Sequence, residues 1–333
     1  MKANVLTALL VGIFLFAGCG PSTGWIVKPV PLRARLTETV LASDRGLFVA
    51  DKIVLLDADG LLVNRRSQGA FSSGENPVSL FVEKLDKAQA DPQVKAVVLR
   101  INSPGGSVTA CDIMYRKLME FRAAKTVPVV AIFEDVGASG AYYLACGADS
   151  ILAHPTSVTG SIGVLVQTFS FSGTMKLIGI KARAVTSGPR KDLASPFKPL
   201  DEKDIAILQG LVDEYYRRFL EVVRTSRQGI DPERLKPLAD GRVFTGRAAA
   251  ENGLVDAVGY MDDAVALAKK LSGAKHVKIV MYHRPPGYRA NVYSEARLPT
   301  ASQVNLLNVS AGDLLDLGRP QFLYLWMGKT SGR

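Results

Sequence analysis

The sequence predicts an α/β protein with a parallel-rich sheet built from ββα and βαβ units and flanked by helices. Short apolar runs of strand type at 94–101 and 127–133 alternate with segments of helical pattern at 108–124 and 139–147. This alternation is typical of crossover connections between parallel strands. A chain of 333 residues with 47% apolar content can bury one large core or two smaller ones.

The remaining elements are predicted from the same patterns. Lys52 begins a strand, and Asn76, followed by proline, starts a helix that runs from 78 to 90. Thr245 caps a short helix that Gly253 ends. Further strands are expected at 151–153, 163–167 and 181–185, and further helices at 173–179 and 201–228. The apolar stripe of the longest helix is predicted to face the core and consists of Ile205, Leu208, Leu211, Val212, Tyr215, Phe219, Val222 and Val223.

One serine stands at a predicted strand-to-helix turn. The strand at 129–133 is followed by Gly-Ala-Ser-Gly, in which Ser139 directly precedes the small and apolar start of a helix. At such an elbow the hydroxyl can project at the mouth of the sheet, and the free N–H groups of the helix start point toward a nearby oxyanion. This geometry suits acyl transfer with Ser139 as the nucleophile.

A glycine-rich turn follows the preceding strand. The segment Asn-Ser-Pro-Gly-Gly at 102–106 combines a proline, which fixes φ, with two glycines, which permit positive φ. The backbone can therefore turn an N–H group outward without a side chain in the way. We expect the N–H groups of Gly106 and Gly140 to form an oxyanion hole.

The residues alone do not identify the general base. His154 could serve Ser139, with Asp135 or Asp149 as the orienting acid, while His276 and His283 lie in no partner motif. The other route is a lysine that burial keeps neutral, which requires a strongly lowered pKa.

Four segments resemble, in this order, the signal peptide peptidase A family of serine/lysine peptidases; they are Arg100–Val108, Gly137–Ala145, Thr159–Val164 and Ser187–Pro196. The resemblance runs from about residue 52 to 278. It implies a ClpP/crotonase-like fold. It also implies that Ser139 is the nucleophile, that Lys191 is the general base and that Ser161 orients this lysine. It also implies a homo-oligomeric ring, because in the short members the serine and the lysine come from neighbouring subunits.

Two other residues bear on this resemblance. Caseinolytic protease subunits share the Asn-Ser-Pro-Gly-Gly turn but carry a histidine about twenty-five residues beyond the serine, where this chain has Val164. That departure favours a Ser/Lys pair over a Ser-His-Asp triad. Arg190, beside Lys191, is expected to favour the neutral form of the lysine if it is not exposed.

The resemblance implies a serine endopeptidase that cleaves signal peptides already released from their proteins, or other membrane-proximal hydrophobic peptides, without a cofactor or a metal. Two alternatives remain open from the sequence. One is an inactive member of the family that acts as a membrane scaffold. The other is a crotonase-like acyl-CoA enzyme, which the pairing of Ser139 with Lys191 disfavours.

The N-terminus predicts attachment to a membrane. An apolar run at 5–17 has the length of a signal peptide and is short for a membrane-spanning helix. Phe-Ala-Gly-Cys at 16–19 resembles a bacterial lipoprotein cleavage site, with Cys19 as the lipidated residue; an uncleaved anchor is the competing interpretation. Both place the catalytic part on the extracytoplasmic (periplasmic) side of the cell membrane.

Composition excludes other classes of function. The formal net charge of +10 is spread along the chain without a nucleic-acid motif, so we interpret it as solvated surface with some attraction to anionic lipid. Cys111 and Cys146 lie in apolar helical patterns and are expected to be buried and free, while an oxidising compartment leaves a disulfide open. No cysteine and histidine spacing of zinc type occurs.

Four regions are therefore expected. Residues 1–18 form the signal peptide or anchor, 19–51 a tether, 52–280 the peptidase domain and 281–333 an irregular C-terminal extension. Within the extension, the apolar segment 322–327 is predicted to pack on the protein's own surface.

Overall fold

A computed structural model describes residues 35–284, except 47, 66, 67, 70, 71, 74 and 200, and residues 321–327. The helices and strands belong to one unit that starts at Leu36. The predicted signal segment, Cys19 and most of the tether lie outside the described residues.

The main sheet has the strand order β1-β13-β2-β5-β7-β8-β12, and β7 also pairs with β9, which in turn pairs with β11. All of these pairings are parallel except β1 with β13 and β9 with β11. The bounds are β1 (Thr37–Ser43), β2 (Lys52–Asp59), β5 (Val94–Ser103), β7 (Val129–Ala138), β8 (Ser150–Ala153), β9 (Val158–Gly160), β11 (Val243–Thr245), β12 (Ala257–Val258) and β13 (Lys278–His283).

Helices follow the strands as the sequence predicts. Asn76 accepts hydrogen bonds from the N–H groups of Val78 and Ser79 and so starts the first helix, while Thr245 accepts one from Ala248. The helices are α2 (Pro77–Ala90), α3 (Val108–Lys125), α4 (Gly140–Ala145), α5 (Ser172–Leu177), α6 (Glu202–Ser226), α7 (Pro232–Leu238), α8 (Gly246–Glu251) and α9 (Met261–Ser272).

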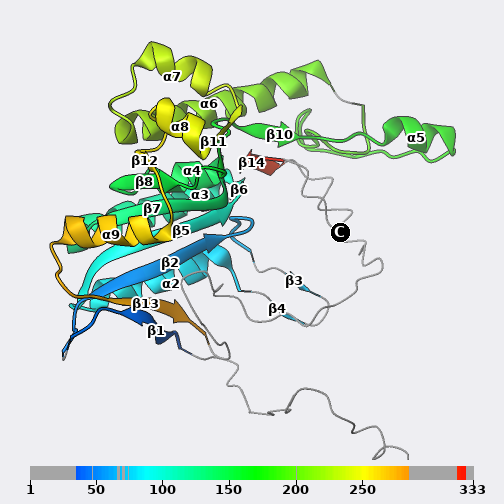
Figure 1. Ribbon diagram of the computed structural model, residues 1–333. Coiled ribbons are helices and arrows are strands. Elements are labelled where there is room, and N and C mark those ends of the chain that lie inside the picture. The colour runs from blue at the N-terminus through cyan, green and yellow to red at the C-terminus, as the bar shows by residue number, and fades with distance from the viewer. Residues whose placement is uncertain are drawn as a thin grey trace, which may run out of the picture. The chain divides into compact units, whose positions relative to one another are not determined.

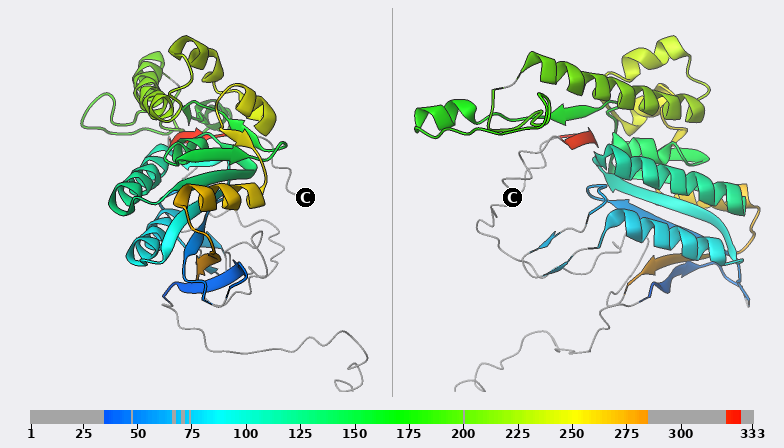
Figure 2. Two further views of the ribbon diagram at one scale, coloured as in Figure 1. Left: turned by 60° about the vertical axis from the view of Figure 1, so that its left-hand side comes forward. Right: turned by 180° about the vertical axis from the view of Figure 1, so that it is seen from behind.

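Two apolar cores lie on the two faces of the sheet, with α9 on one face and α2, α3 and α4 on the other (Figure 1; Figure 2, left). Alternate residues of one strand serve the two cores: Val97 and Leu99 face the larger core, and Ala96 and Val98 face the core under α9. This alternation is the period-2 pattern of a strand that is buried on both faces.

A second, smaller sheet lies beside the end of β5. Its strand order is β10-β14-β6, with β10 (Leu165–Gln167) and β6 (Gly105–Ser107) on either side of β14 (Gln321–Leu325). Both pairings of β14 are antiparallel. Two short strands, β3 (Gln68–Gly69) and β4 (Ser72–Ser73), pair separately.

The structure confirms the predicted alternation of strands and helices and corrects several details. No strand forms at 181–185, where an exposed loop follows α5. Residues 37–43, assigned to the tether, form the edge strand β1. Residues 321–325, assigned to an irregular extension, form β14 in the middle of a sheet. Ile205, predicted in the core stripe of α6, is 48% exposed, because the first turns of this helix extend beyond the sheet.

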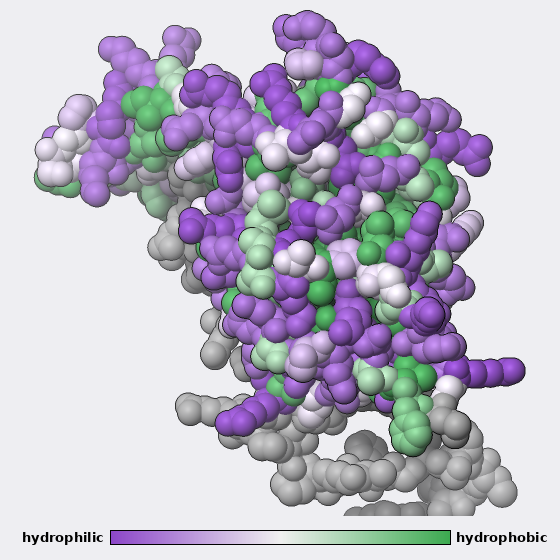
Figure 3. Space-filling view, turned by 90° about the vertical axis from the view of Figure 1, so that its left-hand side faces the viewer, coloured by the Kyte–Doolittle hydropathy of each residue, from purple (hydrophilic) through white to green (hydrophobic). Residues whose placement is uncertain are grey.

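The surface seen in Figure 3 is mostly hydrophilic, and its apolar residues form small separate patches. Apolar residues scattered in this way are ordinary on a protein surface that faces water. No helix among the described residues is both long enough and apolar enough to cross a bilayer.

Candidate active site

Ser139 lies between the end of β7 and the first residue of α4. Its backbone has φ 55° and ψ −117°, a conformation that is costly for a residue with a side chain. Two hydrogen bonds hold it there: its N–H donates to Gly160 O at 2.8 Å, and its carbonyl accepts from Tyr143 N at 2.9 Å. Ser139 is only 1% exposed. The predicted elbow is therefore present in a strained and closely held form.

Small residues make this elbow fit. A methyl group on Gly137 would overlap the ring of Phe133, and one on Gly140 would overlap Sγ of Cys111. The hydroxyl of Thr159 donates to Gly137 O at 2.7 Å, which ties β9 to the end of β7. The Gly-Ala-Ser-Gly sequence therefore lets the chain pass from strand to helix inside a packed core.

Ser161 lies next to Ser139, as the prediction of a shared site requires. Ala138 pairs with Gly160 in parallel register, so the following residues of the two strands, Ser139 and Ser161, emerge side by side. Ser161 also has positive φ, 51°, and its N–H donates to Arg242 O at 2.7 Å. Two strained serines thus share one end of the sheet.

The predicted oxyanion donors face this same region. Leu62 N–H donates to Gly105 O, and Ser107 N–H donates to Leu62 O, so the intervening residue Gly106 directs its N–H to the opposite side of β6. Gly140 is the first residue of α4, where N–H groups have no partner within the helix. A methyl group on Gly105 would lie 2.7 Å from Gly140 N, which shows how closely the turn approaches the elbow.

A buried ion pair fixes the strand that leads into this turn. Nε of Arg100 lies 2.8 Å from Asp57 Oδ1, and both side chains are almost fully buried between β5 and β2. Further along, Ser103 Oγ donates to Gly60 O at 2.6 Å and accepts from Gly105 N at 3.1 Å. The buried ion pair and the hydrogen bonds of Ser103 thus fix the backbone at the start of the glycine turn.

Lys191, by contrast, is exposed and lies in a turn at 188–194. This turn belongs to the segment between β10 and α6, which includes α5 and extends beyond the sheet (Figures 1 and 2). Within the described part of the chain, no hydrogen bond or ion pair joins Lys191 to Ser139 or Ser161. The structure brings together Ser139, Ser161, Gly106 and Gly140 but not the predicted base.

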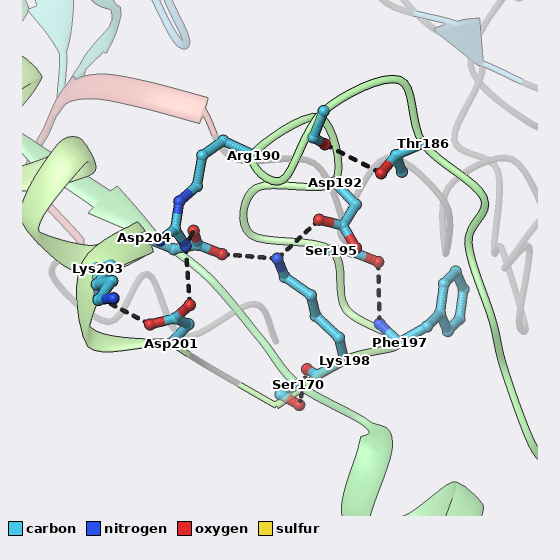
Figure 4. A network of polar contacts seen from close by, with 11 residues as sticks. Ser170, Thr186, Arg190, Asp192, Ser195, Phe197, Lys198, Asp201, Lys203 and Asp204 are labelled. Atoms are coloured by element: carbon cyan, nitrogen blue, oxygen red, sulfur yellow. Dashed lines mark hydrogen bonds and ion pairs between the residues drawn. The ribbon is translucent and has the colours of Figure 1, made fainter.

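An ionic network anchors the turn that carries Lys191 (Figure 4). Asp204, whose side chain is 4% exposed, lies 2.6 Å from Arg190 and 2.7 Å from Lys198. Asp192 also pairs with Lys198, at 2.9 Å, and Asp201 with Arg190, at 2.8 Å. The charge of Arg190 is thus compensated by two carboxylates, and its side chain is 36% exposed. The geometry therefore gives no support to the expectation that Arg190 favours the neutral form of Lys191.

Sequence reasoning missed this network. Asp204 lies in the first turn of α6, where an acidic residue is ordinary, and only the fold brings it to residues 190–198. The alternation of basic and acidic residues at 190–204 was a visible signal, but it does not distinguish a folded network from a solvated surface.

The three histidines do not contact Ser139 in the described structure. His154 lies against the ring of Tyr260, 5.2 Å between centroids, and burial lowers its pKa. His283 shares a hydrogen bond with Thr39 at the edge of the sheet, and His276 is exposed. Asp149, a candidate orienting acid, instead accepts from Val129 N. A Ser-His-Asp triad therefore has no support in this geometry.

Both predicted core cysteines are buried and free. Burial raises the pKa of Cys146 to about 11 and raises that of Cys111 further. Because the thiolate is the reactive form, these side chains serve packing, with Cys111 against the start of α4.

A parallel α/β sheet with a strained serine at a helix start, beside a second glycine N–H donor, has the arrangement of a serine hydrolase. Comparisons with known proteins narrow this class. Residues 121–275 match the model of peptidase family S49. A candidate signal peptide peptidase SppA of Enterococcus faecium is 34% identical over 231 residues, which cover 69% of this chain and 67% of the relative.

A second relative and one solved structure are also similar to this chain. A candidate protease of Methanocaldococcus jannaschii is 36% identical over 249 residues, covering 74% of this chain and 79% of that protein. Among solved structures, the 1510-N membrane-bound stomatin-specific protease K138A mutant in complex with a substrate peptide has a TM-score of 0.44 and 13% identity, covering 72% of this chain and 95% of that one. The chain belongs to peptidase family S49, the signal peptide peptidase A family, and is a serine-type peptidase.

The anchoring role of Asp204 can be tested by limited trypsin digestion. Pairing with Lys198, and then with Arg190, lowers the pKa of Asp204. The ionised carboxylate therefore stabilises the turn fully above the ordinary pKa of about 3.9, and this stabilisation is lost as the pH falls through the lowered pKa. At neutral pH, Asp204→Asn should therefore make cleavage after Arg190 or Lys191 several times faster.

Asp213→Asn is the matched control for this digestion. Asp213 lies on the exposed side of the same helix, and among the described residues its hydrogen-bond partner is Gln209. Its cleavage rate should equal that of the wild type. Equal rates for wild type and Asp204→Asn would show that the network does not hold the turn.

Proposed function

We propose that this chain is a membrane-tethered, extracytoplasmic serine endopeptidase that uses a Ser139/Lys191 dyad and an acyl-enzyme intermediate. The observation that carries the proposal is the strained elbow of Ser139 beside the N–H groups of Gly106 and Gly140. Strain of this kind persists where the surroundings impose it, and it concentrates at functional sites.

The chemistry follows from these positions. Lys191 takes the proton of Ser139 Oγ as the oxygen attacks the carbonyl carbon of the peptide bond. The oxyanion receives N–H donors from Gly106 and Gly140, each worth about 3 kcal/mol in the transition state. The proton then passes to the leaving amine as the C–N bond breaks, and water hydrolyses the ester on Ser139. Ser161, next to Ser139, orients the lysine.

Lys191 reaches this site from a second copy of the chain. Two observations support this arrangement: the turn of Lys191 is exposed and makes no bond to its own Ser139, and the segment that carries it exposes large apolar side chains. The apolar side chains that are exposed in this segment are Phe169, Phe171, Leu177, Ile178, Ile180, Val185 and Phe197. Such a surface is typical of contacts between subunits. We therefore propose a homo-oligomeric ring.

The substrates are hydrophobic peptides near a membrane, with cleaved signal peptides as the first candidates. The name of the Enterococcus faecium relative and the apolar run that precedes Cys19 support this class and this location. Lipid on Cys19 would keep the peptidase domain near such peptides on the extracytoplasmic side.

Mixing two inactive variants tests the shared site. Ser139→Ala removes the nucleophile, and Lys191→Met removes the base, so each variant alone should hydrolyse a hydrophobic fluorogenic peptide at least about 10³-fold more slowly than the wild type. When the two are dissociated, mixed and reassembled, activity should return, because some sites then combine an intact Ser139 with an intact Lys191.

The controls use the same variants. Reassembly of Ser139→Ala with itself should restore nothing. Activity retained in Lys191→Met would overturn the base assignment, and a mixture that stays inactive would contradict the shared site. A folded wild type without any activity would favour an inactive scaffold.

Attachment through Cys19 has its own test. In bacterial cells grown with labelled palmitate, the full chain should carry the label and sediment with membranes, while Cys19→Ser should lose the label. Cys146→Ser is the matched control, because that thiol is buried, and it should keep the label. A labelled Cys19→Ser variant would contradict lipidation at this residue; an unlabelled wild type that stays with membranes would indicate an uncleaved anchor.

A further inference from the structure

An arm of the chain, residues 168–199, leaves the sheet after β10 and ends at α6. It projects from the body of the protein, with α5 at its far end (Figure 1; Figure 2, right). At the base of the arm its two limbs are joined, because Phe171 N–H donates to Pro196 O at 2.7 Å and Ser170 Oγ donates to Lys198 O at 2.7 Å. The arm is therefore an ordered projection with a fixed base.

The outer part of the arm buries almost nothing. Every residue of the stretch 176–187, the arm tip, is exposed, and α5 has no buried residue. Four large apolar side chains lie in the tip: Leu177 is 87% exposed, Ile178 65%, Ile180 52% and Val185 96%. Single exposed apolar residues are ordinary, but a group of this size within twelve residues marks an interaction surface.

Local hydrogen bonds hold the end of α5 in one shape. Ile178 N–H donates to Thr174 O at 3.2 Å, and Ile180 N–H donates to Met175 O at 2.8 Å. Between them Gly179 has φ 75°, the left-handed conformation that lets a chain turn at the end of a helix. One tight turn therefore presents Leu177, Ile178 and Ile180 together.

The charge of the tip is entirely positive. Lys176, Lys181 and Arg183 are exposed, and the chain contains no acidic residue between Asp149 and Asp192. Among the residues that the structure describes, none of these three basic side chains has an ion-pair partner. Apolar side chains flanked by free basic ones are typical of a segment that lies on an anionic bilayer. The apolar groups enter the headgroup region, and the basic groups stay with the lipid phosphates.

The base of the arm has a different chemistry. Its three exposed phenylalanines, Phe169, Phe171 and Phe197, lie in a region whose basic residues Arg190 and Lys198 are paired with carboxylates. This neutralised base suits the proposed contact between subunits. At the tip, a second copy of the chain would have to supply three matching carboxylates, because unpaired charges in a protein interface cost free energy. An anionic bilayer supplies phosphates wherever the tip lies.

The N-terminal strand starts at the end of the sheet from which the arm projects. Thr37, the first residue of β1, pairs with His283, the last residue of β13, and β13 runs parallel to β2. β1 therefore begins where the parallel strands end, the end that also carries β6 and the arm (Figure 1). A tether that precedes β1 thus enters the sheet at the same end as the arm.

We propose that the arm tip is a second membrane contact, which lies on an anionic lipid surface. Its apolar side chains rest among the headgroups, and its three basic side chains pair with lipid phosphates. The contact adds to the proposed attachment through Cys19 and depends neither on it nor on the catalytic role of Ser139. Because the turn of Lys191 follows the tip directly, docking would hold this turn close to the bilayer.

Quenching by brominated lipid tests whether the tip touches a bilayer. In the full chain, Trp25→Phe and Trp326→Phe remove the two native tryptophans, and Val185→Trp places a new one in the tip. The chain is mixed with vesicles of phosphatidylcholine and phosphatidylglycerol brominated on their acyl chains. The emission should shift to the blue and lose more than half of its intensity, because an interfacial segment reaches the boundary of headgroups and acyl chains.

Phe48→Trp in the same background is the matched control. Phe48 is 97% exposed, as Val185 nearly is, but it lies between β1 and β2 at the opposite end of the sheet. Its emission should stay that of a tryptophan in water. Equal quenching at both positions, or none at Val185→Trp, would overturn the proposal. A blue shift without quenching would also overturn it, because a second copy of the chain would then cover the tip.

The three basic residues of the tip are tested by replacing all of them with glutamine in the Val185→Trp chain. Each basic residue at an anionic surface strengthens binding by about 1 kcal/mol, which is about fivefold, so the ratio of docked to undocked tip should fall about a hundredfold. The control replaces three exposed basic residues at the opposite end of the sheet and should keep the quenching; its changes are Arg45→Gln, Lys270→Gln and Lys275→Gln. Equal quenching in the two triple variants would contradict the pairing with phosphates.

Trypsin digestion of the unaltered chain covers the case in which the tryptophan background does not fold. Vesicles with phosphatidylglycerol should slow cleavage after Lys176, Lys181 and Arg183 several times relative to vesicles of phosphatidylcholine alone, and high salt should abolish this protection. Cleavage after Arg45 and Lys275, which are also exposed, should be unchanged. Equal cleavage of the tip in both kinds of vesicle would overturn the proposal. If Cys19 carries no lipid but the tip is still protected, the tip proposal stands and the proposed attachment fails.

Discussion

The backbone conformation of Ser139 is the constraint on which the rest of the site depends. A positive φ at a buried serine persists because β7 pairs with β9 up to Ala138, while the N–H and the carbonyl of Ser139 are both held by hydrogen bonds. This arrangement fixes the direction of the hydroxyl, starts α4 with a glycine N–H, and brings Ser161 alongside. The glycine turn at 102–106 can approach so closely only because Gly105 has no side chain, since a methyl group there would lie 2.7 Å from Gly140 N. Preorganised donors of this kind need no rearrangement during the reaction.

The proposed machinery is divided between a packed core and an exposed segment. The core holds the nucleophile and the oxyanion donors, whereas Lys191 lies on a turn that an ionic network around Asp204 keeps in shape. A separated base would make activity depend on assembly. This dependence would restrict the peptidase to the place where its subunits meet.

The sequence predicted the alternating fold and the elbow well, because buried parallel strands and small residues at a turn leave strong local patterns. It could not predict the network of Asp204, whose partners are brought together only by the path of the chain between β10 and α6. It also misplaced 321–325, since an apolar run of six residues has the same appearance on a surface, at an edge or in a cleft. The strand predicted at 181–185 does not form, because in the described structure its apolar pattern has no neighbouring strand to pair with.

Covalent labelling tests the central claim, that Ser139 is a nucleophile activated at this elbow, most directly. The full chain is incubated with a diphenyl phosphonate of Phe-Leu-Tyr, and peptide mass spectrometry then locates the adduct. One adduct on Ser139, absent from Ser139→Ala and strongly slowed in Lys191→Met, is the predicted result. An adduct on another residue, or a folded chain that carries none while a general serine hydrolase in the same tube is labelled, would contradict it.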